Sequence, residues 1–154
     1  MLSIIEIINK KASFSYRLTE HFTAGIQLKG AEIKSIRNKD VVIKDSYCVL
    51  VKSEVWVRNI HISKYKQDST DQHNPSREKK LLLNKSEVKK ITKSINEKGM
   101  SLIPTKLFIN EKGLAKLEIG IGKGKKLYDK REDIKKRDVD KQIDREKKRG
   151  NKFP

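Results

Sequence analysis

The sequence has little cysteine, no long apolar run and far fewer acidic than basic side chains. Its single cysteine, Cys48, excludes an internal disulfide, argues against a structural zinc site and lies in an apolar segment typical of a buried, inert thiol. No apolar run approaches the roughly 20 residues that span a bilayer. The apolar start, residues 1–8, lacks a basic n-region and a small-residue cleavage site. We therefore expect a soluble, cytoplasmic protein whose residues 1–8 pack on the body or are loosely ordered.

Patterns typical of catalysis and metal binding are also missing from the sequence. The three histidines have no metal-ligand spacing with one another or with the cysteine. No Ser-His-Asp set or pair of catalytic carboxylates stands out, and the segment 120–125 lacks the Walker spacing of a phosphate loop. A nuclease would need several carboxylates gathered on a metal ion, and Asp40 with Asp45 alone does not indicate such a site. We expect no catalysis, no metal and no other cofactor.

Positive charge is abundant along the whole chain. Lys and Arg number 37 against 20 Asp and Glu, which gives a net charge of +17. Residues 123–154 hold 14 of these cations and 7 of the anions, so residues 1–122 are basic in their own right. Such an excess favours a nucleic acid or another anionic surface as the partner, although AT-biased coding also raises the lysine content.

The segment 122–131 combines glycines, one tyrosine and five cations within ten residues. Glycines let a backbone come close to a partner, and clustered cations gain affinity by releasing counterions from phosphates. Residues 132–149 contain only three apolar side chains, too few to build a core, but many helix formers. We expect an RNA-binding arm that is mobile when free and helical when held, with an ordinary solvated tail as the alternative.

Hydrophobic periodicity predicts a mainly β body. The expected strands span residues 12–18, 22–28, 46–51, 55–62, 102–104, 106–109 and 114–119. The polar stretches between them are expected to form turns at 19–21 and 52–54 and a long loop at 66–80. Helices are expected over residues 31–37 and from a cap at Asn84 or Ser86 to Gly99. Six or seven short strands predict an antiparallel barrel or a strongly curled sheet, because closure removes exposed edges.

Six segments in this order carry a resemblance to a known family. They are residues 9–12, 24–37, 44–47, 59–62, 75–83 and 122–131. Over about residues 9–149 the chain resembles the SmpB family, small proteins that partner transfer-messenger RNA in bacterial ribosome rescue. The resemblance implies an α+β, mainly β fold: an OB-fold-like antiparallel barrel with two or three helices and a C-terminal tail that is disordered when free. It divides the chain into an RNA-binding barrel, residues 9–131, and a basic tail, residues 132–154, that is helical on the ribosome.

The resemblance also implies a function. The family's proteins bind the tRNA-like domain of transfer-messenger RNA and deliver it to stalled 70S ribosomes for trans-translation. The tail then occupies the empty mRNA channel of the small subunit, beyond the decoding centre, and no codon is read. The implied protein is a cytoplasmic monomer in the complex, without a membrane partner. The alternatives are a ribosomal structural RNA-binding protein and a metal-dependent ribonuclease.

Positions that match the family's motifs supply the expected site residues. Those expected to bind RNA are Thr23, Glu32, Lys34, Arg37, Leu82, Asn84, Lys116, Lys123, Lys125 and Lys126. Those expected to contact the ribosome are Phe14, Asp129, Lys130, Arg131, Lys135, Lys136 and Arg137. The chain departs from the family at two points, where Thr23 stands for a commonly acidic residue and Ser13-Phe14 for an Arg-His pair. Contacts at these points are expected to be weaker or altered.

The residues themselves leave other interpretations open for this set. Asn84 can cap a helix, Leu82 can belong to the core, and Lys116 can be an ordinary solvated lysine. Glu32 can orient Lys34 or Arg37 instead of touching RNA. The cations of the segment 122–131 are the firmest prediction, because no apolar neighbour requires them structurally.

Overall fold

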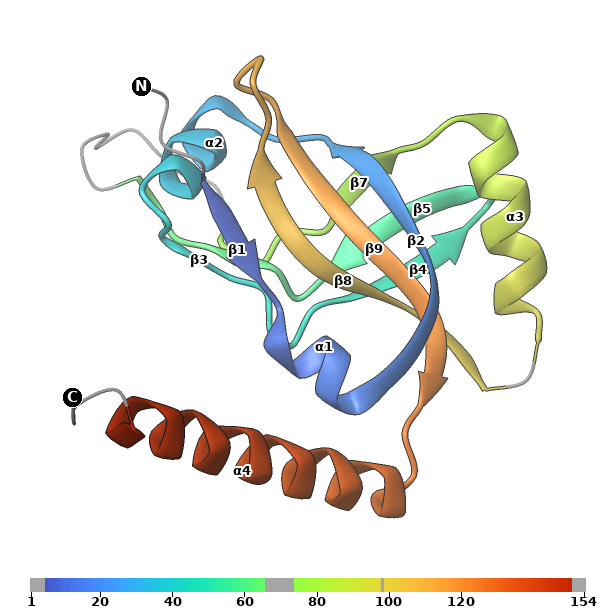
Figure 1. The fold of residues 1–154 in the computed structure, drawn as a ribbon. Helices are drawn as coiled ribbons and strands as arrows, with labels where there is room; N and C mark the ends of the chain where they lie inside the picture. Colours follow the sequence, from blue (N-terminus) through green and yellow to red (C-terminus); the bar gives the residue numbers. More distant parts are fainter. Residues whose placement is uncertain (1–4, 66–73, 98, 151–154) are drawn as a thin grey trace. The chain divides into compact units, whose positions relative to one another are not determined.

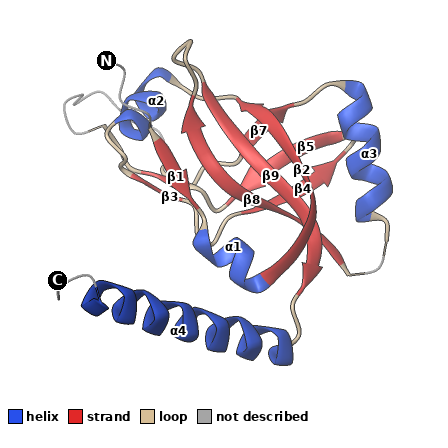
Figure 2. Ribbon diagram, viewed as in Figure 1, coloured by secondary structure: helices blue, strands red, loops and turns tan. Residues whose placement is uncertain are grey.

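The computed structural model describes residues 5–65, 74–97 and 99–150, with side chains 127–129 and 146–150 left undescribed (Figure 1). The chain divides into two compact units, residues 1–124 and residues 125–154. Strands dominate the first unit, and a single long helix makes up the described part of the second (Figure 2). No helix in the described ranges is both long enough and apolar enough to cross a membrane.

The elements alternate along the chain. The strands are β1 (Glu6–Ile8), β2 (Tyr16–Ile26), β3 (Val41–Val42), β4 (Tyr47–Val51), β5 (Glu54–Arg58), β6 (His61–Ile62), β7 (Lys79–Leu82), β8 (Met100–Ile109) and β9 (Ala115–Gly124). The helices are α1 (Lys10–Ser15), α2 (Gly30–Arg37), α3 (Lys85–Ile95) and α4 (Leu127–Gly150).

Seven strands form one antiparallel sheet in the order β1-β8-β9-β2-β7-β5-β4, and β3 pairs with β6 in a separate ribbon. β4 lies at one end of this order and β8 near the other, yet β4 and β8 contact each other. The sheet is therefore curled almost closed, as its arrangement in Figure 1 shows. The expected OB-fold-like antiparallel barrel, with three helices in the first unit, is confirmed.

Irregularities in the longest strands produce the curl. β2 has a bulge between Leu18 and Glu20, and β8 has one after Pro104. Bulges bend a strand and increase its twist. At the first bulge β9 passes so close to β2 that a Cβ on Gly122 would lie 2.1 Å from the carbonyl oxygen of Arg17. Only glycine allows this approach.

Inward apolar and outward polar side chains alternate along β9, and the inward ones form part of the core. Its inward side chains are all buried: Ala115, Leu117, Ile119 and Ile121. Lys116 and Glu118 lie between them and face outward. Two helices contribute fully buried side chains to the same core, Ile36 from α2 and Ile91 from α3. The barrel is thus apolar inside and polar on its outer face.

Several local predictions are confirmed. The hairpin between β4 and β5 turns at Lys52 and Ser53, whose φ angles of 49° and 63° suit the primed two-residue turns that match strand twist. α2 covers the expected helix, and α3 begins after Asn84, one of the two expected caps, but it ends at Ile95, before the expected Gly99. Gly113, with φ of 78°, lies in the turn of the expected hairpin between β8 and β9, whose strands are longer than predicted.

The N-terminal strand predictions were partly wrong. Residues 10–15 form α1, which Asn9 anchors by donating a side-chain hydrogen bond of 2.8 Å to the carbonyl oxygen of Pro104. Ala12 of this helix is buried, so tertiary packing overrides the local alternation. Residues 19–21 are no turn, because β2 runs through them to Ile26. Their polarity reflects an exposed outer face beside the bulge.

Two further strand predictions change in the structure. The strand expected over 55–62 is broken at Asn59, whose φ of 63° turns the chain from β5 to β6. Within the expected loop 66–80, β7 already begins at Lys79, while residues 66–73 lie outside the described residues. At the N-terminus, Glu6–Ile8 form β1 beside β8, and residues 1–4 lie outside the described residues.

The described part of the second unit consists of Lys125, Lys126 and the helix that follows. α4 starts at Leu127, so the predicted division after Arg131 falls inside a helix, and the compact units divide before Lys125. Its exposed apolar side chains are Ile134, Val139 and Ile143. The helix formers of the tail are helical in the structure.

Candidate nucleic-acid interface

Three predicted site residues from separate segments meet on the outer face of the barrel. In the register of the central strands, Gly25 of β2 is opposite Lys116 of β9 on one side and opposite Leu82 of β7 on the other. Thr23, two residues before Gly25, is opposite Glu118. Directly paired residues project to the same face of a sheet. We call Thr23, Leu82 and Lys116 the strand-face cluster.

Leu82 is exposed. The interpretation that it belongs to the core, which its run of leucines favoured, was therefore wrong. The core residue of that run is Leu81, which is 3% exposed, whereas Leu82 is 53% exposed. A Cβ on Gly25 would lie 3.2 Å from the Cβ of Leu82. The glycine therefore leaves room for the leucine to lie against β2, where it offers an apolar contact surface beside Lys116.

Lys116 is a cation of this face that has no carboxylate partner among the described residues. On the neighbouring strand, Lys106 lies 3.0 Å from Glu6 and 3.8 Å from Glu118, and its hydrogen bond to Glu6 raises its pKa. No carboxylate within the described part of the chain pairs with Lys116 in the same way. Its partner across the ladder is Phe108. A lysine without a protein counterion on a rigid strand is suited to contact a phosphate.

Asn84 has the capping role that the sequence left open. Its Oδ1 accepts hydrogen bonds from the backbone N–H of Glu87 at 3.0 Å and from the hydroxyl of Ser86 at 2.8 Å. The carboxylate of Glu87 returns a contact to the backbone N–H of Asn84, which completes a capping box. Among the described residues, no hydrogen-bond acceptor contacts its Nδ2, so this amide remains free to donate to a base edge or a ribose.

Glu32 is buried, which corrects the expectation that it contacts RNA or orients Lys34 and Arg37. Its side chain is 0% exposed, and its Oε1 lies 2.6 Å from Nη2 of Arg77. The same Oε1 accepts a 2.8 Å hydrogen bond from the backbone N–H of Lys29. The carboxylate therefore ties the start of α2 to the segment that leads into β7.

Lys79 completes this buried charge network. It is fully buried at the start of β7, where its Nζ lies 3.9 Å from Oε2 of Glu32 and donates to the carbonyl oxygens of Arg77 at 2.6 Å and of Ile60 at 3.4 Å. Burial lowers the pKa of Lys79 to about 8; the carboxylate of Glu32 opposes this shift and the charge of Arg77 adds to it. The network holds β7, and hence Leu82 and Asn84, in position.

The cations of α2 lie at one end of the barrel. Lys34 is exposed, and its Nζ lies 5.4 Å from the centroid of the Tyr65 ring. Arg37 is also exposed, and its Nη2 lies 3.7 Å from the point that a Cβ on Gly113 would occupy, in the turn between β8 and β9. Figure 1 shows α2 and this turn at the same end of the first unit. Lys34 and Arg37 are thus exposed and available to a partner, whereas Glu32 has a buried structural role.

The cations after β9 differ in their environment. Lys123 is exposed at the end of β9, opposite Arg17. Lys125 is only 13% exposed and forms an ion pair with Asp133 of α4. Lys125 therefore has a structural role that its sequence context did not indicate, whereas Lys126 is exposed.

The predicted ribosome-contacting residues are divided between α1 and α4. Phe14 is half-buried on α1 and not on a strand. Four residues are exposed on α4, Arg131, Lys135, Lys136 and Arg137, and Lys130 is half-buried. Asp129 lies at the start of α4, but its side chain is outside the described residues.

The described residues include neither a metal-binding cluster nor an exposed thiol. In residues 5–65, 74–97 and 99–150, no group of three or more His, Cys, Asp and Glu side chains could hold a metal ion. Cys48 is buried, and this burial raises the pKa of its thiol, which fits the inert role predicted for it. The principal residues that the sequence did not reveal are Arg77 and Lys79. The inward register of β7 would have identified Lys79, because it alternates with buried Leu81.

A curled antiparallel barrel with a cationic, solvent-exposed strand face and a basic helical extension defines a small nucleic-acid-binding protein of the OB-fold type. Comparison with known proteins identifies the family within this class. The model of the family described as "SmpB protein" matches residues 6–149, and the chain belongs to this family.

Relatives of the chain cover nearly its whole length. The SsrA-binding protein of Phocaeicola vulgatus is 49% identical over 141 residues, which are 92% of this chain and 94% of the relative. The SsrA-binding protein of Flavobacterium johnsoniae is 47% identical over 151 residues, 98% of this chain and 100% of the relative. A chain from the solved structure "tmRNA-SmpB: a journey to the center of the bacterial ribosome" superposes with a TM-score of 0.68 and 35% identity, covering 80% of this chain and 86% of the other.

Proposed function

We propose that this chain is the RNA-binding adaptor of trans-translation. It binds the tRNA-like domain of transfer-messenger RNA and delivers it to stalled ribosomes. Membership of the SmpB family and the similarity to a chain of a tmRNA-SmpB structure support this function. The observation from the chain itself that carries it is the strand-face cluster, in which an uncompensated lysine and an exposed leucine lie on one rigid sheet.

Each member of this surface has a distinct chemical task. Lys116 contacts a phosphate, and Leu82 packs against a base or a ribose. The free amide of Asn84 donates to a base edge or a 2′-hydroxyl. Thr23 contributes a hydroxyl beside Glu118, and Lys34 and Arg37 extend the positive field toward the end of the barrel. Rigid strands hold the cluster in place, so little side-chain order has to be created on binding.

The extension after β9 serves the ribosome. Residues 9–131 act as the RNA-binding domain and residues 132–154 as the tail that occupies the empty mRNA channel. The cations of α4 contact ribosomal RNA there, together with Phe14 near the decoding centre. Lys123 and Lys126 add phosphate contacts to the RNA-binding domain, and Lys125 first holds Asp133 at the start of α4. The protein works as a monomer in the cytoplasm, where ribosomes are.

The adaptor performs no catalysis, which separates it from a ribonuclease, and it does not depend on a fixed place in every ribosome, which separates it from a ribosomal structural protein. A metal-dependent ribonuclease would cleave RNA when magnesium is added and stop when a chelator removes it. A ribosomal structural protein would sediment with ribosomes in fixed proportion, whether or not they are stalled. The adaptor does neither and retains one structured RNA.

Substitution of Lys116 tests the proposed surface. Lys116→Ala should weaken binding of the tRNA-like domain about tenfold and reduce the slope of log affinity against log salt by about one phosphate contact. The matched control is Lys112→Ala, an exposed lysine in the turn between β8 and β9. Equal effects of the two substitutions would show that net charge, and not the strand face, binds the RNA.

A further inference from the structure

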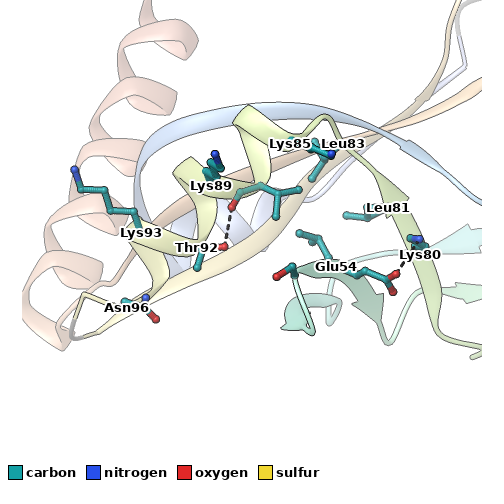
Figure 3. Close-up of a pocket in the computed structure, with 12 residues that line it drawn as sticks. Glu54, Lys80, Leu81, Leu83, Lys85, Lys89, Thr92, Lys93 and Asn96 are labelled. Carbon is teal, nitrogen blue, oxygen red and sulfur yellow. Dashed lines mark hydrogen bonds and ion pairs between the residues drawn. The ribbon is translucent and has the colours of Figure 1, made fainter.

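A second surface lies next to the strand-face cluster, where β7 pairs with β5. A groove of about 760 Å³ runs between α3 and the strands β5 and β7 (Figure 3). Its lining comes from two regions that are apart in sequence. The lining residues with apolar side chains are Val55, Leu81, Leu83 and Val88. No aromatic side chain lines it among the described residues, so its floor is aliphatic.

Lysines border this floor on both sides. Lys85, Lys89 and Lys93 follow one another at intervals of four along α3, which places them in a stripe about 12 Å long on one side of the helix (Figure 3). Lys80 of β7 stands on the opposite side of the groove. The one acidic side chain in the described lining, Glu54, is already paired with Lys80 at 3.2 Å.

The charge of the stripe is uncompensated. In the described ranges, no carboxylate pairs with Lys85, Lys89 or Lys93, and all three are exposed. Helix propensity alone does not require three lysines on the side of α3 that borders an apolar groove. Their juxtaposition with an aliphatic floor matches a ligand that is acidic at its edges and apolar along its centre.

Charge and chemistry select among the candidate occupants. α4 carries 10 cations and 7 anions, and a second copy of the chain carries a net charge of +17, so both are repelled by the stripe. Single-stranded RNA prefers aromatic platforms on which its bases stack, and this floor offers none. An acidic amphipathic helix fits, because such helices place apolar side chains at i, i+3, i+4 and i+7 into a hydrophobic groove.

We propose that the groove between α3 and β5–β7 docks an acidic amphipathic helix of a partner protein. The apolar face of that helix packs on Leu81, Leu83 and Val88, and its carboxylates pair with the lysine stripe of α3. A segment of about three turns matches the length of α3. Because Asn84 caps α3, the docked helix lies next to the proposed RNA contact.

A designed peptide tests the groove with the full-length protein. The probe is a fluorescently labelled helical peptide of three turns, with leucine at i, i+3, i+4 and i+7 and glutamate at most other positions. We expect saturable binding that is at least about tenfold stronger than that of a control peptide in which serine replaces each leucine, since four buried apolar side chains are lost. Equal binding of the two peptides would overturn the proposal.

Substitutions on α3 locate the binding site. Lys89→Glu should weaken peptide binding about tenfold, whereas Lys90→Glu, an equal charge change at an exposed position outside the lining, should alter it less than about twofold. Unchanged thermal melting of both variants shows that the fold is kept. Equal losses would indicate nonspecific attraction and overturn the proposal. So would displacement of the peptide by a single-stranded RNA whose own binding depends on Lys89, because the groove would then bind nucleic acid.

Discussion

At the scale of single residues, Glu32 and Lys79 illustrate how buried charge positions an outer surface. The carboxylate of Glu32 holds Arg77 at 2.6 Å, and Lys79 donates to two backbone carbonyls at the start of β7. Removing one member of such a network leaves an uncompensated buried charge. The role of these residues is therefore to fix the strand that presents Leu82.

The lowered pKa of Lys79 predicts a specific pH dependence of stability. Between its folded value of about 8 and its ordinary value of 10.5, the unfolded chain binds a proton that the folded chain lacks. The free energy of unfolding should therefore rise with pH across this window, by about 2 kcal/mol between pH 8 and pH 10, and lack this gain below pH 8. Urea unfolding at several pH values measures it.

Lys79→Met is the matched comparison for that experiment. All other ionisable groups are the same in both proteins, so the difference between the two pH profiles isolates Lys79. The rise should disappear in the variant, which keeps the pair between Glu32 and Arg77. An identical rise in both proteins would contradict a neutral, buried Lys79 at high pH.

At the scale of elements, the bulge at which β2 and β9 approach each other closely contributes to the curl of the barrel. A Cβ on Gly122 would lie 2.1 Å from a backbone oxygen of β2, which cannot move aside without opening the ladder. Gly122→Ala should therefore lower the free energy of unfolding by about 3 kcal/mol. Gly124→Ala is the control, because a Cβ there meets nothing within 4 Å. The melting temperature of the Gly122→Ala protein should be clearly lower than that of the control. Equal melting temperatures would show that β9 tolerates a side chain at position 122.

The two lysines just before α4 are expected to differ in function. Lys126 is exposed, whereas the charge of Lys125 is compensated by Asp133. Lys126→Ala should reduce the salt slope of RNA binding by about one phosphate contact, and Lys125→Ala should reduce it less. Affinities measured at several salt concentrations test this. A larger effect at Lys125 would mean that RNA displaces Asp133.

Local signals explain which elements the sequence predicts well. Asn84 with Glu87 three residues later, followed by apolar residues at helical spacing, specifies α3 without help from the rest of the fold. The alternation of β9 likewise identifies its buried face. By contrast, the helix at residues 10–15 depends on Asn9 reaching the backbone of a distant strand, and the break at Asn59 depends on a single left-handed residue.

The candidate site was predictable only in part, because its parts meet through the sheet. The motif match named Thr23, Leu82 and Lys116, but their meeting on one face follows from the register of β9, β2 and β7. The burial of Glu32 and the pairing of Lys125 with Asp133 are contacts between segments that no local pattern encodes. The groove beside α3 is likewise formed by residues far apart in sequence.

At the scale of the whole molecule, the proposed function assigns RNA binding to residues 9–131 and ribosome contact to the tail. Ending the chain after Arg131 should keep the affinity for the tRNA-like domain within about twofold, because the barrel supplies the structured contact surface, and abolish rescue of stalled ribosomes. Ending it after Gly124 also removes Lys126 and should weaken RNA binding further. Binding and rescue assays on both truncated proteins measure the division, and full rescue by either would refute it.

The most direct measurement of the central claim identifies the RNA that accompanies the protein in cells. The full-length chain is purified under native conditions and the bound RNA is sequenced, with the Lys116→Ala protein purified in parallel. The proposed function predicts strong enrichment of transfer-messenger RNA with the unaltered chain and clearly less with the variant. Recovery of ribosomal RNA alone, or of no RNA, from cells rich in transfer-messenger RNA would contradict it.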